Sequence, residues 1–199
     1  MRFGGLAAIL LAVTSWLAVV AYYTIAQRGQ DEVGMEIVAL LAALVAFWSL
    51  FAVTAVHWTL RAHGEAWSLF AVLVGLAAAV GAMTAALYPV AFTRAVLARP
   101  LDASAPSPIP VAVAATDPLN VMSLGLTGLW FVIVSLLLWR GRTSRGLAIV
   151  GMAAAAMLLF GFFAALGAQA SVVPAISIVA GVVVVPLFWL WAGILLRRA

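Results

Sequence analysis

Long apolar runs separated by short polar segments make up most of the chain, and six of these runs are long enough to be membrane spans. A helix needs about 20 predominantly apolar residues to cross a hydrocarbon core that is about 30 Å thick. The runs are continuous and do not alternate polar with apolar residues, as the strands of a membrane β-barrel do. We therefore predict an all-α fold, a polytopic transmembrane bundle of six helices in a single domain. The predicted spans are residues 3–26, 35–60, 66–89, 118–139, 147–166 and 172–196.

The fourth and fifth spans are the most regular part of this pattern. They are joined by the seven residues RGRTSRG, which contain Arg140, Arg142 and Arg145. So short a connection predicts an antiparallel helical hairpin with a tight, strongly basic turn. Upstream, Asp117 and Pro118 are typical of a helix start, because Asp caps free amides and Pro suits the first helical position.

The chain between the third and fourth spans is less regular. Residues 90–99 are apolar but carry Arg94 and Arg99. They form either a short helix in the membrane interface or the end of a tilted third span. Residues 100–116 contain four Pro among Ala, Ser and Val, which predicts an extended linker.

The first span has a rival interpretation as a cleaved signal peptide, because residues 19–21 (Val-Val-Ala) have the form of a cleavage site. Its apolar run is longer than the usual signal-peptide core of about 7–15 residues. We therefore favour an uncleaved span. The choice does not change the orientation predicted for the remaining five spans.

Small residues are concentrated in the middle of the third span. They recur at the small-xxx-small spacing that lets two membrane helices approach closely. We therefore predict that this span is a central packing helix. The residues at that spacing are Gly75 and Ala79, and Ala77, Gly81 and Ala85.

Pro186 lies in the middle of the sixth span. A proline there has no N–H to offer to the Val182 carbonyl and should kink the helix. Transporters built from inverted repeats usually interrupt corresponding spans in both halves. Pro186 has no such counterpart in the third span, where Pro89 stands at the end.

Composition agrees with a protein whose main solvent is the bilayer. The chain is 67% hydrophobic and 8% charged, whereas a soluble domain is about 45–50% apolar and about 25% charged. Only helices or closed barrels satisfy their backbone groups in lipid. The sequence has no Cys, which excludes disulfides and thiolate chemistry.

Charges divide unevenly between the two ends that six spans create. The end with both termini holds seven Arg and one acid, and the other end holds three Arg and five acids. The positive-inside rule therefore predicts an inner (plasma) membrane protein with both termini cytoplasmic and the 100–116 linker outside. The seven Arg are Arg2, Arg61, Arg140, Arg142, Arg145, Arg197 and Arg198. Anchoring in the interfaces is predicted for the Trp residues near span ends, Trp58, Trp67, Trp139, Trp189 and Trp191.

The hairpin also carries a family resemblance. It contains residues 128–130 (Gly-Leu-Trp), an apolar run that closes at Arg140, and residues 144–151 (SRGLAIVG). With the closing residues 195–198 (LLRR), this resembles a family of small bacterial six-span membrane proteins, catalogued as a domain of unknown function. The resemblance implies a single membrane domain. It implies no activity, so no functional residue is carried over.

The strongest candidate for a ligand site is a polar face of the fourth span. Asn120, Ser123 and Thr127 share one helical face over two turns. This face either lines a path for a small ligand or solute, or forms hydrogen bonds between helices. Such bonds contribute only about 0.6 kcal/mol each.

A second candidate face, near the end of the second span, carries Thr54, His57 and Arg61. His57 is either a pH-sensitive group or an ordinary interfacial side chain. A haem would need two opposed ligands, and the other His, His63, lies on the same hairpin, so no cofactor is expected. Glu32 and Glu36 are either a cation-gathering mouth or a solvated helix start.

The basic turn offers a third candidate site. Arg140, Arg142 and Arg145 are predicted to bind anionic lipid head groups, with about 1 kcal/mol from each Arg near an anionic surface. Orientation in the membrane would explain the same charges, and the two explanations are compatible.

No catalytic set is visible in the sequence. It lacks H-E-x-x-H, G-x-S-x-G, a phosphate-binding Gly loop and paired intramembrane carboxylates. We predict a non-enzymatic structural or accessory membrane component that binds a lipid or a hydrophobic ligand between helices, without a cofactor or metal. The alternative is a transporter or permeation unit for a small neutral or lipophilic solute, using the Asn120 face and the Pro186 kink. Expected partners are membrane lipids and either further copies of the chain or a larger membrane complex, and nucleic acid is not expected.

Overall fold

The computed structural model describes residues 2–26, 32–97, 118–167, 176 and 179–198, and every element within them is helical. Six of the described helices are long and apolar enough to cross a membrane, which confirms the predicted all-α, six-span fold. The predicted linker 100–116 and the start of the predicted sixth span, residues 172–175, lie outside the described residues. The helices are α1 (Arg2–Ala21), α3 (Glu32–Leu60), α4 (Glu65–Leu97), α5 (Pro118–Arg140), α6 (Arg145–Leu166) and α8 (Val185–Arg198).

Three short helical turns complete the described structure. A π-helical turn, η1 (Tyr22–Ala26), continues α1, and a second one, η3 (Ala180–Val184), leads into α8. The 3-10 turn η2 (Arg61–His63) joins α3 to α4, and Gly64 closes it at a φ of 156°. Because α4 runs on to Leu97, residues 90–97 continue the third span and do not form a separate interfacial helix.

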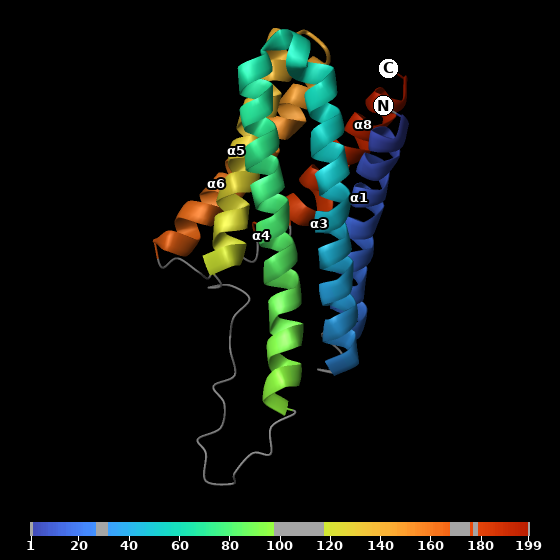
Figure 1. The fold of residues 1–199 in the computed structure, drawn as a ribbon, viewed down its shortest axis with the longest axis vertical. Coiled ribbons are helices and arrows are strands. Elements are labelled where there is room, and N and C mark those ends of the chain that lie inside the picture. The colour runs from blue at the N-terminus through green and yellow to red at the C-terminus, as the bar shows by residue number, and fades with distance from the viewer. Residues whose placement is uncertain (1, 27–31, 98–117, 168–175, 177–178, 199) are drawn as a thin grey trace.

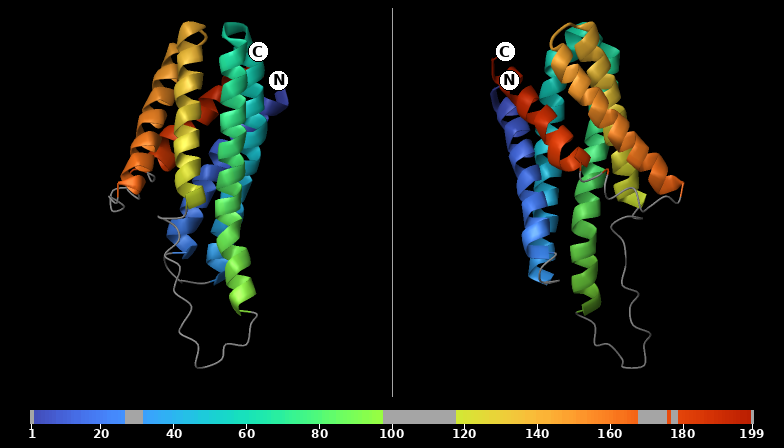
Figure 2. Two further views of the ribbon diagram at one scale, coloured as in Figure 1. Left: turned by 60° about the vertical axis from the view of Figure 1, so that its left-hand side comes forward. Right: turned by 180° about the vertical axis from the view of Figure 1, so that it is seen from behind.

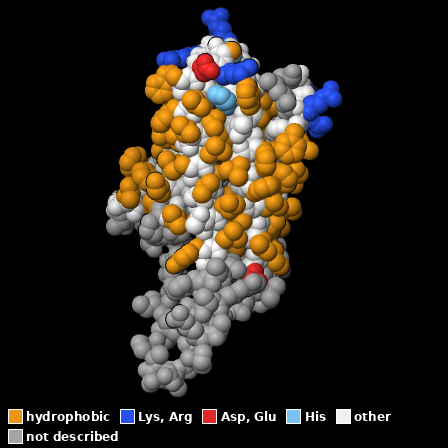
Figure 3. Space-filling view, in the orientation of Figure 1, with side chains coloured by type: hydrophobic (Ala, Val, Ile, Leu, Met, Phe, Trp, Pro, Cys, Tyr) orange, Lys and Arg blue, Asp and Glu red, His pale blue; other side chains and the backbone are white. Residues whose placement is uncertain are grey.

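The helices form a ring in which each one packs on the next (Figures 1 and 2). The order around the ring is α6, α5, α4, α3, α1 and α8. A smaller interface between α8 and α6 closes the ring. Both chain ends lie at the same end of the bundle as the α3–α4 and α5–α6 turns (Figure 1). We call this the basic end, because it carries the seven Arg named above (Figure 3).

Large apolar side chains cover the outside of the ring, as Figure 3 shows for one face. Ile149 and Phe163, for example, are 60% and 63% exposed. Small side chains such as Ala8, Ala52 and Ala154 are completely buried. Six apolar spans with such an outer surface identify the chain as a multi-pass membrane protein.

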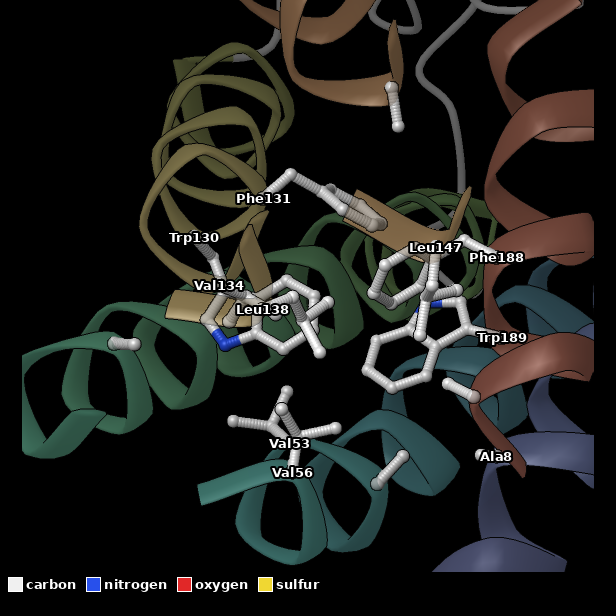
Figure 4. Close-up of a cluster of buried hydrophobic side chains, with 14 of the residues drawn as sticks. Ala8, Val53, Val56, Trp130, Phe131, Val134, Leu138, Leu147, Phe188 and Trp189 are labelled. Carbon is white, nitrogen blue, oxygen red and sulfur yellow. The ribbon is translucent and has the colours of Figure 1, made fainter. Parts of the chain in front are cut away.

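Four aromatic side chains from α5 and α8 fill the centre of the ring (Figure 4). Trp130 and Trp189 stack with their ring centroids 5.0 Å apart, and Phe131 meets Phe188 edge to face at 4.9 Å. Trp189 is only 4% exposed, so its predicted anchoring in the interface is wrong. Closeness to a span end does not decide which way a residue faces. Trp191, two positions later on the helix, is exposed, and its anchoring in the interface stays a prediction.

The third span, α4, occupies one position in the ring, between α3 and α5, and not its centre. Its prediction as the central helix is therefore wrong, because large aromatic side chains occupy that space. Gly75 makes room for one of them: a Cβ at this position would lie 2.7 Å from Cδ1 of Trp130. Gly75 and Ala79 are buried as expected, whereas Ala77 is exposed.

The backbones of α1 and α8 approach each other closely at two glycines. A Cβ on Gly5 would lie 2.9 Å from the Gly193 carbonyl oxygen, and a Cβ on Gly193 would lie 2.8 Å from the Gly5 carbonyl oxygen. Two glycines from opposite ends of the chain therefore form one contact. It joins the first helix to the last at the basic end.

Candidate functional site

The predicted polar face of α5 lies against α4. Ser123 is buried, and its hydroxyl donates to the Asn120 carbonyl of the same helix at 2.8 Å. A Cβ on Gly81 of α4 would lie 3.6 Å from the Ser123 Cβ. Asn120 and Thr127 are half-buried, and this face does not line any of the cavities described below. The structure thus places Ser123 at the interface with α4, and binding of a ligand by Asn120, Ser123 and Thr127 stays a prediction.

The basic turn is a short connection that is held by hydrogen bonds and has exposed charges. Arg140 ends α5, Arg145 begins α6, and Arg142 between them has a left-handed φ of 52°. The Ser144 hydroxyl caps α6 by accepting from the Leu147 N–H. All three Arg are exposed, and the guanidinium of Arg145 lies 5.9 Å from the Trp139 ring centroid. Their binding of lipid head groups stays a prediction.

The predicted face of Thr54, His57 and Arg61 does not come together as one site. The Thr54 hydroxyl donates to its own helix at the Leu50 carbonyl, and Arg61 lies over the Trp58 ring at 4.4 Å. Of the predicted acidic pair, Glu36 is half-buried near the start of α3, and the side chain of Glu32 lies outside the description.

His57 turns instead toward α4, where its Nδ1 lies 2.8 Å from the hydroxyl oxygen of Ser68. A hydroxyl beside an imidazole is also the first requirement of a serine nucleophile. Ser68 is only 1% exposed, however, and the void beside the pair is too narrow for a water molecule. The pair therefore fastens α3 to α4. The sequence could have predicted this contact, because both residues are equally far from the turn centre in an antiparallel hairpin.

The carbonyl that Pro186 leaves without a helical donor has a partner that the sequence did not reveal. The carbonyl of Val182 lacks its usual helical donor and accepts instead from the indole Nε1–H of Trp16 on α1, at 2.7 Å. The chain forms the π-helical turn η3 at this point. The predicted loss of a helical hydrogen bond at Val182 is thereby confirmed. A side chain far away in sequence compensates for it.

An apolar cavity of about 290 Å³ lies among α3, α5, α6 and α8 near the basic end. Five of its lining residues appear in Figure 4: Val56, Val134, Leu138, Leu147 and Phe188. The other apolar lining residues are Leu60, Ala192, Leu195 and Leu196. The sequence predicted no site here, because the wall consists of ordinary core residues from four separate elements.

Three polar side chains also line this cavity: Thr59, Thr143 and Arg198. Thr59 stands one residue before the end of α3, Thr143 lies in the α5–α6 turn, and Arg198 is the last residue of α8. All three therefore gather at the end of the cavity that faces the basic end. The Thr59 hydroxyl donates to the Ala55 carbonyl at 3.1 Å.

The cavity extends inward from these polar groups to the aromatic centre. Phe188 precedes Arg198 by ten residues on α8, which corresponds to about 15 Å along the helix. That distance is half of a hydrocarbon core about 30 Å thick. The residues that line the cavity thus span about 15 Å along α8.

A second, more open groove of about 840 Å³ lies on the outer surface of α1, α3 and α4. Phe3, Phe51 and Trp58 line it, and all three are exposed. Phe3 and Phe51 meet edge to face at 5.3 Å. This groove lies on the lipid-facing surface of the bundle.

No known protein family, curated protein or solved structure matches the chain. The family resemblance of the α5–α6 hairpin therefore stays a prediction. The cavity and its polar rim are therefore the structural features from which a function can be proposed.

Proposed function

We propose that the protein is a non-enzymatic component of the inner membrane, with its basic end in the cytoplasm, that holds a lipid or another hydrophobic ligand in the cavity among α3, α5, α6 and α8. The observation that carries this proposal is the cavity itself. Protein interiors are close-packed, and voids larger than a water molecule are few. A volume of about 290 Å³ is close to the roughly 300 Å³ at which small-molecule sites begin.

The walls of the cavity favour an apolar occupant. Apolar cavities do not hold water well, because a buried water needs about three hydrogen bonds. Empty apolar space in a protein is destabilising, because the side chains that line it lose packing contacts. Hydrocarbon chains are the most abundant apolar groups around a membrane protein. A chain that enters from the bilayer would restore such contacts.

The chemistry of the lining supports retention of a ligand over its conversion. The polar lining residues are two threonines and one arginine, and the lining includes no carboxylate or imidazole. One of the two hydroxyls, on Thr59, already donates to its own backbone. A general base is therefore missing from the described wall of the cavity.

Native mass spectrometry of protein extracted gently from its own membrane tests this proposal. We expect a reproducible small added mass that survives mild activation. Ala192→Phe fills the cavity from α8 and should remove this mass, and Leu195→Trp does so from a second position. Ala153→Phe, on the exposed face of α6, is the matched control and should retain it.

Bare protein under conditions that preserve weak complexes would overturn the proposal. An added mass that persists in both cavity-filling variants would place the ligand elsewhere and overturn it as well. A protein-sized increment seen in the same spectra would identify a partner subunit. It would thereby support the accessory role.

A further inference from the structure

The arrangement of polar groups around the cavity specifies the class of ligand, and this inference rests on the proposed function. We propose that the occupant is a single-chain anionic amphiphile. Its hydrocarbon chain lies toward Phe188, and its anionic group lies at the rim. There Arg198 and the Thr143 hydroxyl are its donors.

The head group must supply the selectivity for such a ligand. A chain that moves from the bilayer into the cavity leaves one apolar solvent for another, so its burial adds little preference. Polar contacts at the rim differ between ligands, because a guanidinium forms paired, charge-assisted hydrogen bonds with a carboxylate or a phosphate. A neutral head group lacks these bonds.

The surrounding charges favour an anion at this rim. The basic end carries seven Arg and a single acid, Glu65, among the described residues. Basic pockets between membrane helices on the cytoplasmic side are typical sites for anionic head groups. Thr143 adds a hydroxyl, which can donate to the same anion. The Thr59 proton already points to the Ala55 carbonyl, so we assign Thr59 to the wall and not to the head group.

Arg198 and its neighbour Arg197 differ in direction, and this provides a matched control. Arg198 lines the cavity, whereas Arg197 packs its stem on α1, where a Cβ on Gly5 would lie 2.6 Å from the Arg197 Cγ. The two side chains are consecutive, exposed and identically charged. Only Arg198 of the two lines the cavity.

The size of the cavity indicates one chain. At about 30 Å³ for each water-sized group, 290 Å³ holds on the order of ten chain carbons. Its lining spans about 15 Å along α8, which is half the thickness of a hydrocarbon core. A two-chain phospholipid would have to leave its second chain outside.

Binding of four probes with the same chain to delipidated protein in a neutral detergent tests the inference. The probes are lauric acid (an anionic carboxylate), methyl laurate (neutral), lauroyl lysophosphatidylglycerol (an anionic phosphate) and lauroyl lysophosphatidylcholine (zwitterionic). We expect the two anionic probes to bind about ten- to hundred-fold more tightly than methyl laurate, the factor that one charge-assisted hydrogen bond supplies. The tighter anion shows whether the natural ligand carries a carboxylate or a phosphate.

Arg198→Gln should reduce the affinity of the anionic probes to that of methyl laurate, and Arg197→Gln should leave it unchanged. Added salt should weaken binding of the anionic probes and have little effect on the ester. Thr143→Ala should reduce anion affinity by a smaller factor than Arg198→Gln does.

Two outcomes separate this inference from the proposed function. If methyl laurate binds as tightly as lauric acid and Arg198→Gln has no effect, the anionic head group is wrong and the cavity remains a ligand site. If no probe binds and the native protein carries no small added mass, the inference and the proposed function both fail. If Arg197→Gln and Arg198→Gln act equally, the effect is one of surface charge, and the assignment to the cavity rim is overturned.

Discussion

Helix α8 makes two kinds of contact, and they use residues of opposite size. Near the basic end, Gly193 allows the backbone of α1 to come within direct contact at Gly5. Deeper in the bundle, Phe188 and Trp189 reach across the centre to the aromatic residues of α5. The first contact needs side chains to be absent, and the second needs large ones.

The difference shows how a helix bundle is held together where solvent provides no hydrophobic drive. Lipid tails are as apolar as the side chains they surround, so association depends on van der Waals packing and on a few hydrogen bonds. Removing a large side chain from the centre should therefore destabilise the bundle, and so should adding a side chain at the α1–α8 contact. The following substitutions test this. The effect of each on stability is measured as the shift in the midpoint of unfolding in a fixed detergent.

Phe131→Ala should have the largest effect, because it empties the aromatic centre. Phe131 is completely buried between Phe188 and Trp189, and its removal should lower the free energy of unfolding by about 3 kcal/mol. Phe163→Ala is the control, since Phe163 is 63% exposed. Equal effects of the two substitutions would show that central packing is not what holds the bundle.

Gly193→Ala tests the opposite requirement at the α1–α8 contact. The added methyl would meet the Gly5 carbonyl, which belongs to the backbone and cannot move aside, so we expect a loss of about 1–3 kcal/mol. Gly181→Ala introduces the same methyl where no atom lies within 4 Å. If Gly193→Ala lowers stability no more than Gly181→Ala does, the close approach of α1 and α8 is contradicted.

Trp16→Phe removes the hydrogen bond from α1 to η3, the turn that leads into α8. We expect a loss of about 0.6 kcal/mol, the average for bonds between membrane helices. In a Pro186→Ala background the alanine N–H can take the Val182 carbonyl, so the same substitution should then have almost no effect. A double-mutant cycle without coupling would contradict this link.

Ser135→Ala should have the smallest effect, and Ser68→Ala is the variant to compare with it. The Ser135 hydroxyl is buried without a hydrogen-bond partner, so its removal should leave stability unchanged or slightly higher. Ser68→Ala takes the partner from His57 Nδ1 and should lower stability by about 1 kcal/mol. The reverse order of the two variants would contradict both assignments.

The candidate sites show why residue type alone was an incomplete guide. The polar residues Asn120, Ser123 and Thr127 were visible in the sequence, but the structure buries Ser123 against α4, and none of the three lines a cavity described above. The apolar cavity had no signature, because residues such as Leu138 and Ala192 line a cavity and fill a core equally well. Only their arrangement in space distinguishes the two roles.

The α3–α4 turn is an intermediate case. His57 was recognised from the sequence, and the antiparallel hairpin alone would have placed Ser68 opposite to it. The contact between Gly141 and the His63 ring, which joins the α3–α4 turn to the α5–α6 turn, involves two separate hairpins. No pattern along one hairpin predicts it.

Continuous apolar runs were enough to establish the six helices, because the bilayer requires every backbone group in a span to bond within its own helix. The missing donor at Pro186 followed from the covalent structure of proline for the same local reason. The order of helices around the ring, the burial of Trp189, the bond from Trp16 to Val182 and the cavity beside Arg198 depended on the tertiary structure. Each of these joins residues far apart in the chain, and in lipid an apolar residue has no preference for the interior until a neighbouring helix provides a surface that fits it.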